Sequence, residues 1–249
     1  MEDIYLAHPP SAEVQLYPLG ESAVVVQFGE TIKRHTHLAV QALSAYLDEY
    51  SFPGFVEYVP AFTTVTVYYN PLEVELAGEA SPSDRVAATL RHMLLKTKAC
   101  TDAPPPVIEI PVCYGGKFGP DLAFVASHTH LTPAEVIDLH TQAEYLVYMI
   151  GFAPGFPYLG GMDEQLVVPR KEKPRTKVPA GSVGIAGKQT GVYSIPTPGG
   201  WQLIGRTPLQ LFTPHAETPS LLSAGNHIRF VSITEREYER SQEHESHYH

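Results

Sequence analysis

The most constraining feature of the sequence is the close spacing of glycine and proline through its second half. Between Gly151 and Ile233, short apolar runs alternate with turns that contain these two residues. Helices need longer uninterrupted stretches, whereas short strands joined by tight turns are typical of sandwiches and barrels. The sequence therefore predicts a closed or folded-over β structure here, preferably a β-barrel.

The first hundred residues follow another pattern, in which strand-like and helix-like stretches alternate. Strands are expected at 14–17, 23–28, 55–59 and 63–69. A helix is expected over 31–50, with Thr31 as its candidate cap, and a second helix begins at Ser81-Pro82 and carries its apolar stripe through Leu95. These elements predict a small α+β unit.

A proline-rich segment at 101–106 separates the two patterns and is expected to connect two domains. The predicted fold class is α+β, with an α+β domain at 1–103, a β-barrel domain at 104–240 and a polar tail at 241–249. The tail contains several histidines, and the end of a frayed helix is favoured over a metal-binding tract.

The barrel domain is expected to begin with a strand at 107–114, in which Pro111 requires an edge or a bulge. Helices are predicted at 121–127 and 133–150. Thr132, followed by Glu135 three residues later, predicts a capping box at the start of the second helix.

Charge and composition limit the classes of function. The chain carries 27 acidic and 17 basic residues, a formal charge of −10, which argues against binding to nucleic acid. The spacing of its two cysteines indicates neither a disulfide nor a zinc site. The sequence offers no signal peptide and no apolar run of roughly 18 residues, so no membrane association and a cytoplasmic location are expected.

The Gly- and Pro-rich segment also carries the candidate binding residues. Arg170, Arg175 and Arg206 present planar guanidinium groups suited to a carboxylate or a phosphate, although exposed arginines and barrel turns would give the same composition. The run from Gly181 through Gly187 to Thr190 resembles a phosphate-binding loop but has Ser182 and Gln189 at two required positions. A nest of backbone amides that binds an anion is the weaker hypothesis that remains.

The histidines do not have the spacing of a metal site, and no metal-binding residues are predicted in this chain. His140 is the exception of interest, because Glu144 and Tyr145 follow it and it could face a pocket; an ion pair on a helix surface is the alternative. Trp201 is interpreted as a plug at a barrel end rather than a stacking surface for a ligand.

Three passages carry a family resemblance: HTQAEYLVYMIGFAPGFPYLGGM at 140–162, the string from PRKEKPR to GRTP at 169–208, and VCYGGKFGPDL at 112–122. They resemble the family of 5-oxoprolinase B subunits (PxpB), also called KipI or allophanate hydrolase subunit 1. GESAVVVQFGE and VPAFTTVTVYYNP extend the match into the first domain. The resemblance implies an N-terminal α+β domain followed by a cyclophilin-like β-barrel.

The same resemblance implies a role in the ATP-dependent opening of 5-oxoproline to L-glutamate, with ATP and Mg as cofactors. The expected partners are a second cyclophilin-like subunit (PxpC or KipA type) and a TIM-barrel-like subunit (PxpA type), and the chain alone is expected to be inactive. Arg170 and Arg206 would then bind anionic groups together with Gly181, Ser182, Gln189 and Thr190. Catalytic roles are hypothesised for His140, Tyr158 and Arg175.

Two further functions stay open. KipI-type members bind and inhibit a sensor histidine kinase, which would make the chain a binding module. Related sequences also form part of urea carboxylase, but this chain shows no biotin-carrying or amidase segment.

Overall fold

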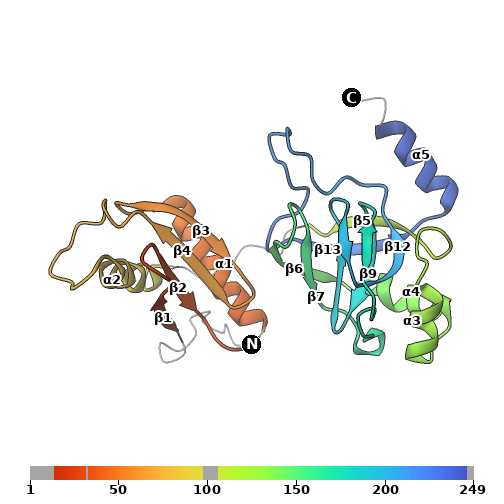
Figure 1. Ribbon diagram of the computed structural model, residues 1–249, viewed down its shortest axis with the longest axis horizontal. Coiled ribbons are helices and arrows are strands. Elements are labelled where there is room, and N and C mark those ends of the chain that lie inside the picture. The colour runs from red at the N-terminus through yellow and green to blue at the C-terminus, as the bar shows by residue number, and fades with distance from the viewer. Residues whose placement is uncertain (1–13, 32, 98–105, 246–249) are drawn as a thin grey trace, which may run out of the picture. The chain divides into compact units, whose positions relative to one another are not determined.

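The computed structural model describes residues 14–31, 33–97 and 106–245. The chain divides into two compact units, Met1–Ala103 and Pro104–His249 (Figure 1). Most of the predicted connecting segment, residues 101–105, lies outside the described residues, as do Cys100 and the last four residues of the tail.

The first unit is a four-stranded antiparallel sheet in the order β1-β2-β4-β3. Its strands are β1 (Gln15–Pro18), β2 (Ala23–Gln27), β3 (Phe55–Pro60) and β4 (Thr64–Tyr69). The helices α1 (Arg34–Glu49) and α2 (Pro82–Leu94) pack against alternate residues of the central strands, among them Val26 and Val67. The unit therefore has its own apolar core between one sheet face and two helices.

The two helix starts differ in how well the sequence predicted them. Ser81 caps α2 as expected, and its hydroxyl accepts a hydrogen bond from the N–H of Asp84. The proposed cap at Thr31 is wrong, because α1 begins at Arg34 and its cap residue, Lys33, makes no side-chain capping bond. An uncapped start leaves no local pattern from which the boundary could be read.

The second unit contains a closed barrel in the order β10-β7-β6-β13-β5-β12-β9. Its strands are β5 (Ile108–Tyr114), β6 (Tyr145–Ile150), β7 (Pro157–Gly160), β9 (Ser182–Ala186), β10 (Gln189–Val192), β12 (Gln202–Arg206) and β13 (His227–Ser232). A separate ribbon joins β8 (Arg175–Val178) to β11 (Thr197–Gly199). The predicted α+β class with a β-barrel in the second half is confirmed.

The helices of this unit correct one prediction. α3 spans Leu122–Thr129, and α4 spans Pro133–Gln142 with the predicted capping box of Thr132 and Glu135. The expected helix over 133–150 is too long, because the backbone becomes extended at Ala143 and Tyr145–Ile150 forms β6. β6 pairs with β7 and β13 and directs Tyr145 and Val147 into the core.

Pro111 lies where its missing N–H is tolerated. β13 runs parallel to β5 beside it, with Val231 opposite Pro111, whereas β12 pairs with β5 only at Cys113 and Tyr114. Pro111 is therefore outside the second ladder, in agreement with the expected edge-like position.

Two main apolar clusters fill the second unit, beside a small third one around Phe118. The larger one occupies the barrel and includes Val112, Val147, Ile185 and Phe230. In the smaller one, Trp201 packs edge-to-face on Phe156 with ring centroids 5.6 Å apart, so the indole is buried as a packing element. The C-terminal helix α5 (Glu235–Glu245) is anchored by Tyr238 against Phe118. None of the described helices is long and apolar enough to cross a membrane.

Candidate functional site

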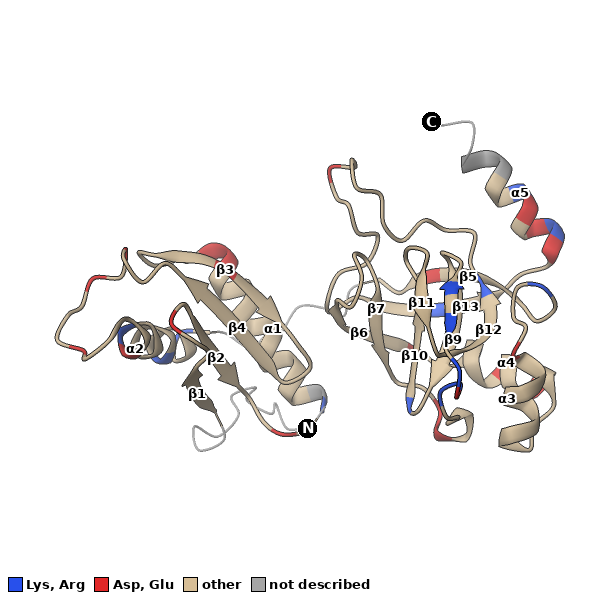
Figure 2. Cartoon of the chain, in the orientation of Figure 1, with Lys and Arg blue, Asp and Glu red and all other residues tan. Residues whose placement is uncertain are grey.

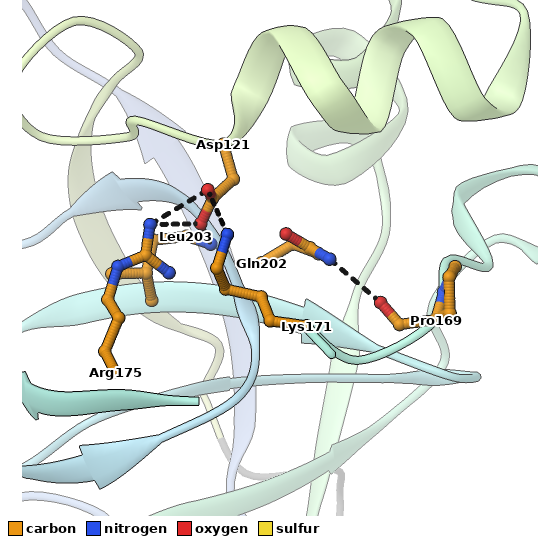
Figure 3. A network of polar contacts seen from close by, with 6 residues as sticks. All are labelled: Asp121, Pro169, Lys171, Arg175, Gln202 and Leu203. Atoms are coloured by element: carbon orange, nitrogen blue, oxygen red, sulfur yellow. Dashed lines mark hydrogen bonds and ion pairs between the residues drawn. The ribbon is translucent and has the colours of Figure 1, made fainter. Parts of the chain in front are cut away.

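A buried carboxylate, that of Asp121, is the centre of the candidate site (Figure 3). Nη2 of Arg175 lies 2.9 Å from Oδ1 and 2.8 Å from Oδ2 of Asp121, and Nζ of Lys171 lies 3.1 Å from Oδ1. Charge-assisted contacts of this kind are stronger than neutral hydrogen bonds. One carboxylate thus fixes two cationic side chains that approach it from the same loop region.

The backbone holds Asp121 itself in place. Its Oδ2 accepts a hydrogen bond from the N–H of Leu203 at 2.7 Å, and its own N–H donates to the carbonyl oxygen of Leu203 at 2.9 Å. Asp121 precedes α3, but its side chain makes no capping bond there. The carboxylate therefore connects the start of α3 to β12 and to the segment that carries Lys171 and Arg175.

The electrostatics keep this carboxylate ionised. Burial alone would raise the pKa of Asp121, but hydrogen bonds from Arg175, from the Leu203 N–H and from Lys171 outweigh burial and lower that pKa. The single negative charge of Asp121 neutralises the charge of only one of its two cationic partners, Arg175 and Lys171. The site consequently retains positive charge, which favours an anionic ligand.

Basic residues follow one another along this segment of the chain (Figure 2). Between 170 and 177 there are five basic residues and one acidic residue, Glu172. Arg170 is exposed on the loop. Burial is the larger influence on Tyr193 and raises its pKa, while the charges of Arg170 and Arg175 both act to lower it. The guanidinium groups of Arg170 and Arg175 therefore both influence the pKa of the same residue, Tyr193, at this end of the barrel.

Gln202, beside Leu203 on β12, completes the polar network. The side chain is 3% exposed, and its Nε2 donates to the carbonyl oxygen of Pro169 at 3.1 Å. Two atoms here, Oε1 of Gln202 and Nη1 of Arg175, are buried and have no hydrogen-bond partner among the described residues. One of these atoms is an acceptor and the other a donor.

Arg206 does not belong to this network. Its Nε donates to the carbonyl oxygen of Ala180 at 2.8 Å, and the residue pairs with Ser182 and Cys113 at the end of β12. Of the three predicted arginines, Arg175 and Arg170 share a region and Arg206 supports the turn before β9.

The predicted nest of backbone amides is not free to bind an anion. The N–H of Gly181 donates to the carbonyl of Tyr193, that of Ser182 to Pro179 and that of Gly187 to Val168. Gln189 and Thr190 lie on β10, opposite Ala186 and Ile185 of β9. The glycines here serve a hairpin and close packing: a Cβ on Gly181 would lie 2.4 Å from the carbonyl oxygen of Thr207.

His140 lies in the barrel core and not on a helix surface. Its Nδ1 is 2.8 Å from Oη of Tyr114, and its Nε2 is 2.9 Å from Oγ1 of Thr190, which donates its proton to the carbonyl of Gly184. Thr190 must therefore accept from Nε2–H, and Tyr114 donates to Nδ1. Burial lowers the pKa of His140 to about 3, so the imidazole is neutral.

The remaining predicted contacts are also resolved. Glu144 lies 2.6 Å from Nδ1 of His227, and not beside His140 as the predicted helix would place it. Tyr158 lies on β7, half-buried and edge-to-face with Phe156. Its hypothesised catalytic role, like that of His140, stays a prediction. Within the described ranges, no group of three or more His, Cys, Asp or Glu residues could hold a metal ion.

The sequence alone did not reveal Asp121 or Gln202 as site residues. Asp121 finds its partners 50, 54 and 82 residues away in the chain, so no local spacing could indicate them. The one available signal was the basic string at 170–177, which needs a buried acid if it is to be held in a fixed geometry.

Comparisons with known proteins agree with this architecture. The family model for the carboxyltransferase domain, subdomain C and D, matches residues 14–222. Among 5-oxoprolinase B subunits, that of Bacillus subtilis is 52% identical over 227 residues, which are 90% of this chain and 95% of the relative. That of Escherichia coli O157:H7 is 43% identical over 216 residues, covering 86% and 94% of the two chains.

A solved structure, that of TTHA0988, superposes with a TM-score of 0.73 and 36% identity. The match covers 85% of this chain and 40% of the longer one, so this chain spans about two fifths of that protein. The family match, the identity over nearly the whole length and the shared fold lead to one conclusion: this chain belongs to the family of 5-oxoprolinase B subunits, within the carboxyltransferase subdomain C and D group.

Proposed function

We propose that the chain is a subunit of an ATP-dependent 5-oxoprolinase, which opens 5-oxoproline to L-glutamate together with partner subunits. The observation that carries the proposal is the pair of cations that the buried Asp121 holds in place, in a chain that matches 5-oxoprolinase B subunits over nearly its whole length. 5-Oxoproline is a small carboxylate, and fixed guanidinium and ammonium groups are suited to bind one.

The contribution of this chain is to bind and orient the substrate. Arg175 is turned toward Asp121 before any ligand arrives, so little side-chain freedom is lost when an anion binds. Lys171 is the more adaptable partner, because its ammonium makes a single contact with Asp121 and its side chain is 29% exposed. The two cations would hold the carboxylate of 5-oxoproline while the lactam ring reacts.

We place ATP and Mg²⁺ in a partner subunit or at a shared interface. The run at 181–190 lacks two residues of a phosphate-binding loop, and its N–H groups at Gly181, Ser182 and Gly187 are used within the chain. No acidic cluster for a metal ion occurs in the described parts. A second cyclophilin-like subunit and a TIM-barrel-like subunit are the proposed partners.

The test is reconstitution with both partner subunits. We expect glutamate to form from 5-oxoproline only when ATP is present, and Arg175→Gln to lower kcat/KM by roughly 100-fold while the complex still assembles. Lys188→Gln is the matched control, because Lys188 forms an exposed ion pair with Glu164 away from Asp121. A verified complex that forms no glutamate would disprove the proposal.

Inhibition of a histidine kinase stays a separate prediction. The test adds the purified chain to a sensor kinase and measures autophosphorylation of the kinase. If a surface other than the Asp121 network is responsible, the Arg175→Gln variant would inhibit the kinase to the same extent as the native chain.

A further inference from the structure

We propose that Phe152 anchors the contact with the second cyclophilin-like subunit, and that its ring enters an uncharged, apolar pocket of that subunit. Three segments, 151–156, 193–198 and 211–214, form the surrounding surface, which is called the Phe152 surface below. This inference rests on the proposed function and names the part of the chain that holds the partner.

The backbone at Phe152 is strained. Its φ is +67°, and the N–H of Ala153 donates to the carbonyl oxygen of Gly151 at 2.8 Å, so Phe152 is the central residue of a three-residue turn. With a positive φ this turn is rare, and glycine adopts it more readily than any residue with a side chain. The other described non-glycine residue with a positive φ is His130, which ends α3 in a left-handed conformation that is common at helix ends.

The Phe152 ring gains little from packing within the chain. It lies edge-on to Phe156, with ring centroids 5.3 Å apart, but the residue remains 64% exposed. No other aromatic residue in the described ranges is as exposed. Strain of this kind persists mainly where a function requires it, and an exposed aromatic side chain on such a turn indicates a binding contact.

The loop is fixed in place before any partner binds. Oγ of Ser194 donates to the carbonyl oxygen of Pro154 at 2.5 Å, which joins the loop to the segment after β10. A Cβ placed on Gly155 would lie 2.9 Å from Cβ of Phe212, so the loop also lies directly against the third segment. A surface held by such contacts loses little conformational freedom when a partner docks.

The Phe152 surface is uncharged. The stretches 145–162, 189–205 and 207–214 contain no Asp, Glu, Lys, Arg or His, although 18% of the chain is charged. Each of the three segments exposes a proline, namely Pro154, Pro196 and Pro214. The centres of protein interfaces are depleted of charge and enriched in aromatic residues. The surface therefore suits an apolar pocket on another protein.

The position of the Phe152 surface indicates which partner it holds. Phe156, which contacts the Phe152 ring, also packs on Trp201, with centroids 5.6 Å apart. Two residues after Trp201, the N–H of Leu203 donates to the carboxylate of Asp121. A layer of aromatic rings thus connects the Phe152 surface to the cation site. A subunit seated here would lie beside that site and could complete it.

The occupant is a different polypeptide and not a second copy of this chain. In TTHA0988 the matched fold makes up 40% of a longer chain, so most of that protein lies outside the match. The occurrence of this fold joined to other sequence favours a partner of a different kind. A second copy is the alternative occupant, which the experiment distinguishes.

The experiment measures the Kd between the full chain and the purified second cyclophilin-like subunit by calorimetry. Phe152→Gly removes the ring and relieves the strained turn. We expect this variant to raise the Kd about 100-fold. Its melting temperature should stay within about 3 °C of that of the native chain, because glycine suits the positive φ. A large fall in melting temperature would assign the ring to folding and overturn the inference.

Phe124→Ala is the matched control. Phe124 is also exposed, to 47%, but it lies on α3 and stacks on His128. We expect its Kd to stay within about twofold of the native value. The inference is wrong if Phe152→Gly binds as tightly as the native chain, if both variants weaken binding equally, or if the native chain does not bind the subunit.

Sedimentation velocity of the isolated chain tests the alternative occupant. A native chain that dimerises, together with a Phe152→Gly variant that stays monomeric, would assign the surface to a second copy and contradict the proposal. Turnover of 5-oxoproline separates the inference from the proposed function. A complex that forms glutamate with unchanged assembly of Phe152→Gly retains the function and loses the surface. A native complex that assembles through Phe152 but forms no glutamate retains the surface and loses the function.

Discussion

Asp121 is a single residue on which the position of several others depends. Replacing it with Asn keeps the shape and an acceptor for the Leu203 N–H but removes the charge that holds Arg175 and Lys171. Since the carboxylate is buried and both cations are partly exposed, we expect a loss of about 1–3 kcal/mol in the free energy of unfolding. Denaturant unfolding of the native chain and the variant measures this difference.

An exposed ion pair provides the control for that substitution. Glu164→Gln removes the partner of Lys188, and both side chains are largely exposed, so its effect should stay within about 0.5 kcal/mol. If the two variants are equally stable, the network around Asp121 does not hold the loop in place.

The burial of His140 predicts that the free energy of unfolding depends on pH. In the unfolded chain it gains a proton near its usual pKa of about 6.5, whereas the folded chain resists protonation until about pH 3. The unfolded state thus binds more protons between these values, and His140 lowers stability as the pH falls through this window. The expected slope is about 1.4 kcal/mol per pH unit.

The measurement is the difference between the native chain and His140→Gln, because other titrating groups cancel in it. The free energy of unfolding of the native chain should fall steadily relative to that of the variant as the pH falls below about 6.5. A difference that is independent of pH would show that His140 can be protonated in the folded state. The variant is expected to be less stable at neutral pH, since Tyr114 and Thr190 lose matched partners.

At this scale the sequence predicted the kinds of side chain better than their contacts. Arg175 was indicated by its place in a Gly- and Pro-rich string, and the structure assigns it to the polar network. The partners of Asp121, the burial of His140 and the free end of Gln202 depend on residues brought together from distant strands. No local spacing encodes such contacts.

At the scale of elements, the turn before α3 lies directly against β12. The N–H of Gly115 donates to the carbonyl of Ile204, and a Cβ placed on Gly119 would lie 1.9 Å from that carbonyl oxygen. Gly119→Ala must therefore displace backbone from backbone, and we expect a loss of about 3 kcal/mol or more. The same displacement would move Asp121, two residues further on.

Gly200→Ala is the matched control, because its new Cβ would meet no atom closer than 3.5 Å. Thermal unfolding of both variants tests the difference between a blocked and an open position. Similar melting temperatures for the two would contradict the close approach of this turn to β12.

The elements also show where local patterns stop being informative. The capping box at Thr132 was predictable because its two residues are three apart and act within one turn. The end of α4 was not, since the apolar residues at 145–150 suit either a helix or a strand, and only pairing with β7 and β13 decides between them. The β-barrel was predictable because the Gly and Pro residues of the sequence mark its frequent turns.

At the scale of the whole molecule, each unit has a core of its own. The apolar cluster between the first sheet and its helices uses residues of 1–103 only, and the barrel cluster uses residues of 104–249 only. The network of Asp121 lies entirely in the second unit. Substitutions that weaken it should therefore leave the first unit unchanged.

This separation predicts that a fragment of residues 104–249 folds by itself and unfolds at the same denaturant concentration as the barrel within the full chain. Trp201, the one tryptophan in the sequence, is buried in this unit, so its fluorescence follows the barrel alone, while circular dichroism follows both units. Asp121→Asn should shift the fluorescence transition equally in the fragment and in the full chain. A fragment without a cooperative transition, or a shift seen in only one of the two, would mean that the barrel requires the first unit for its stability.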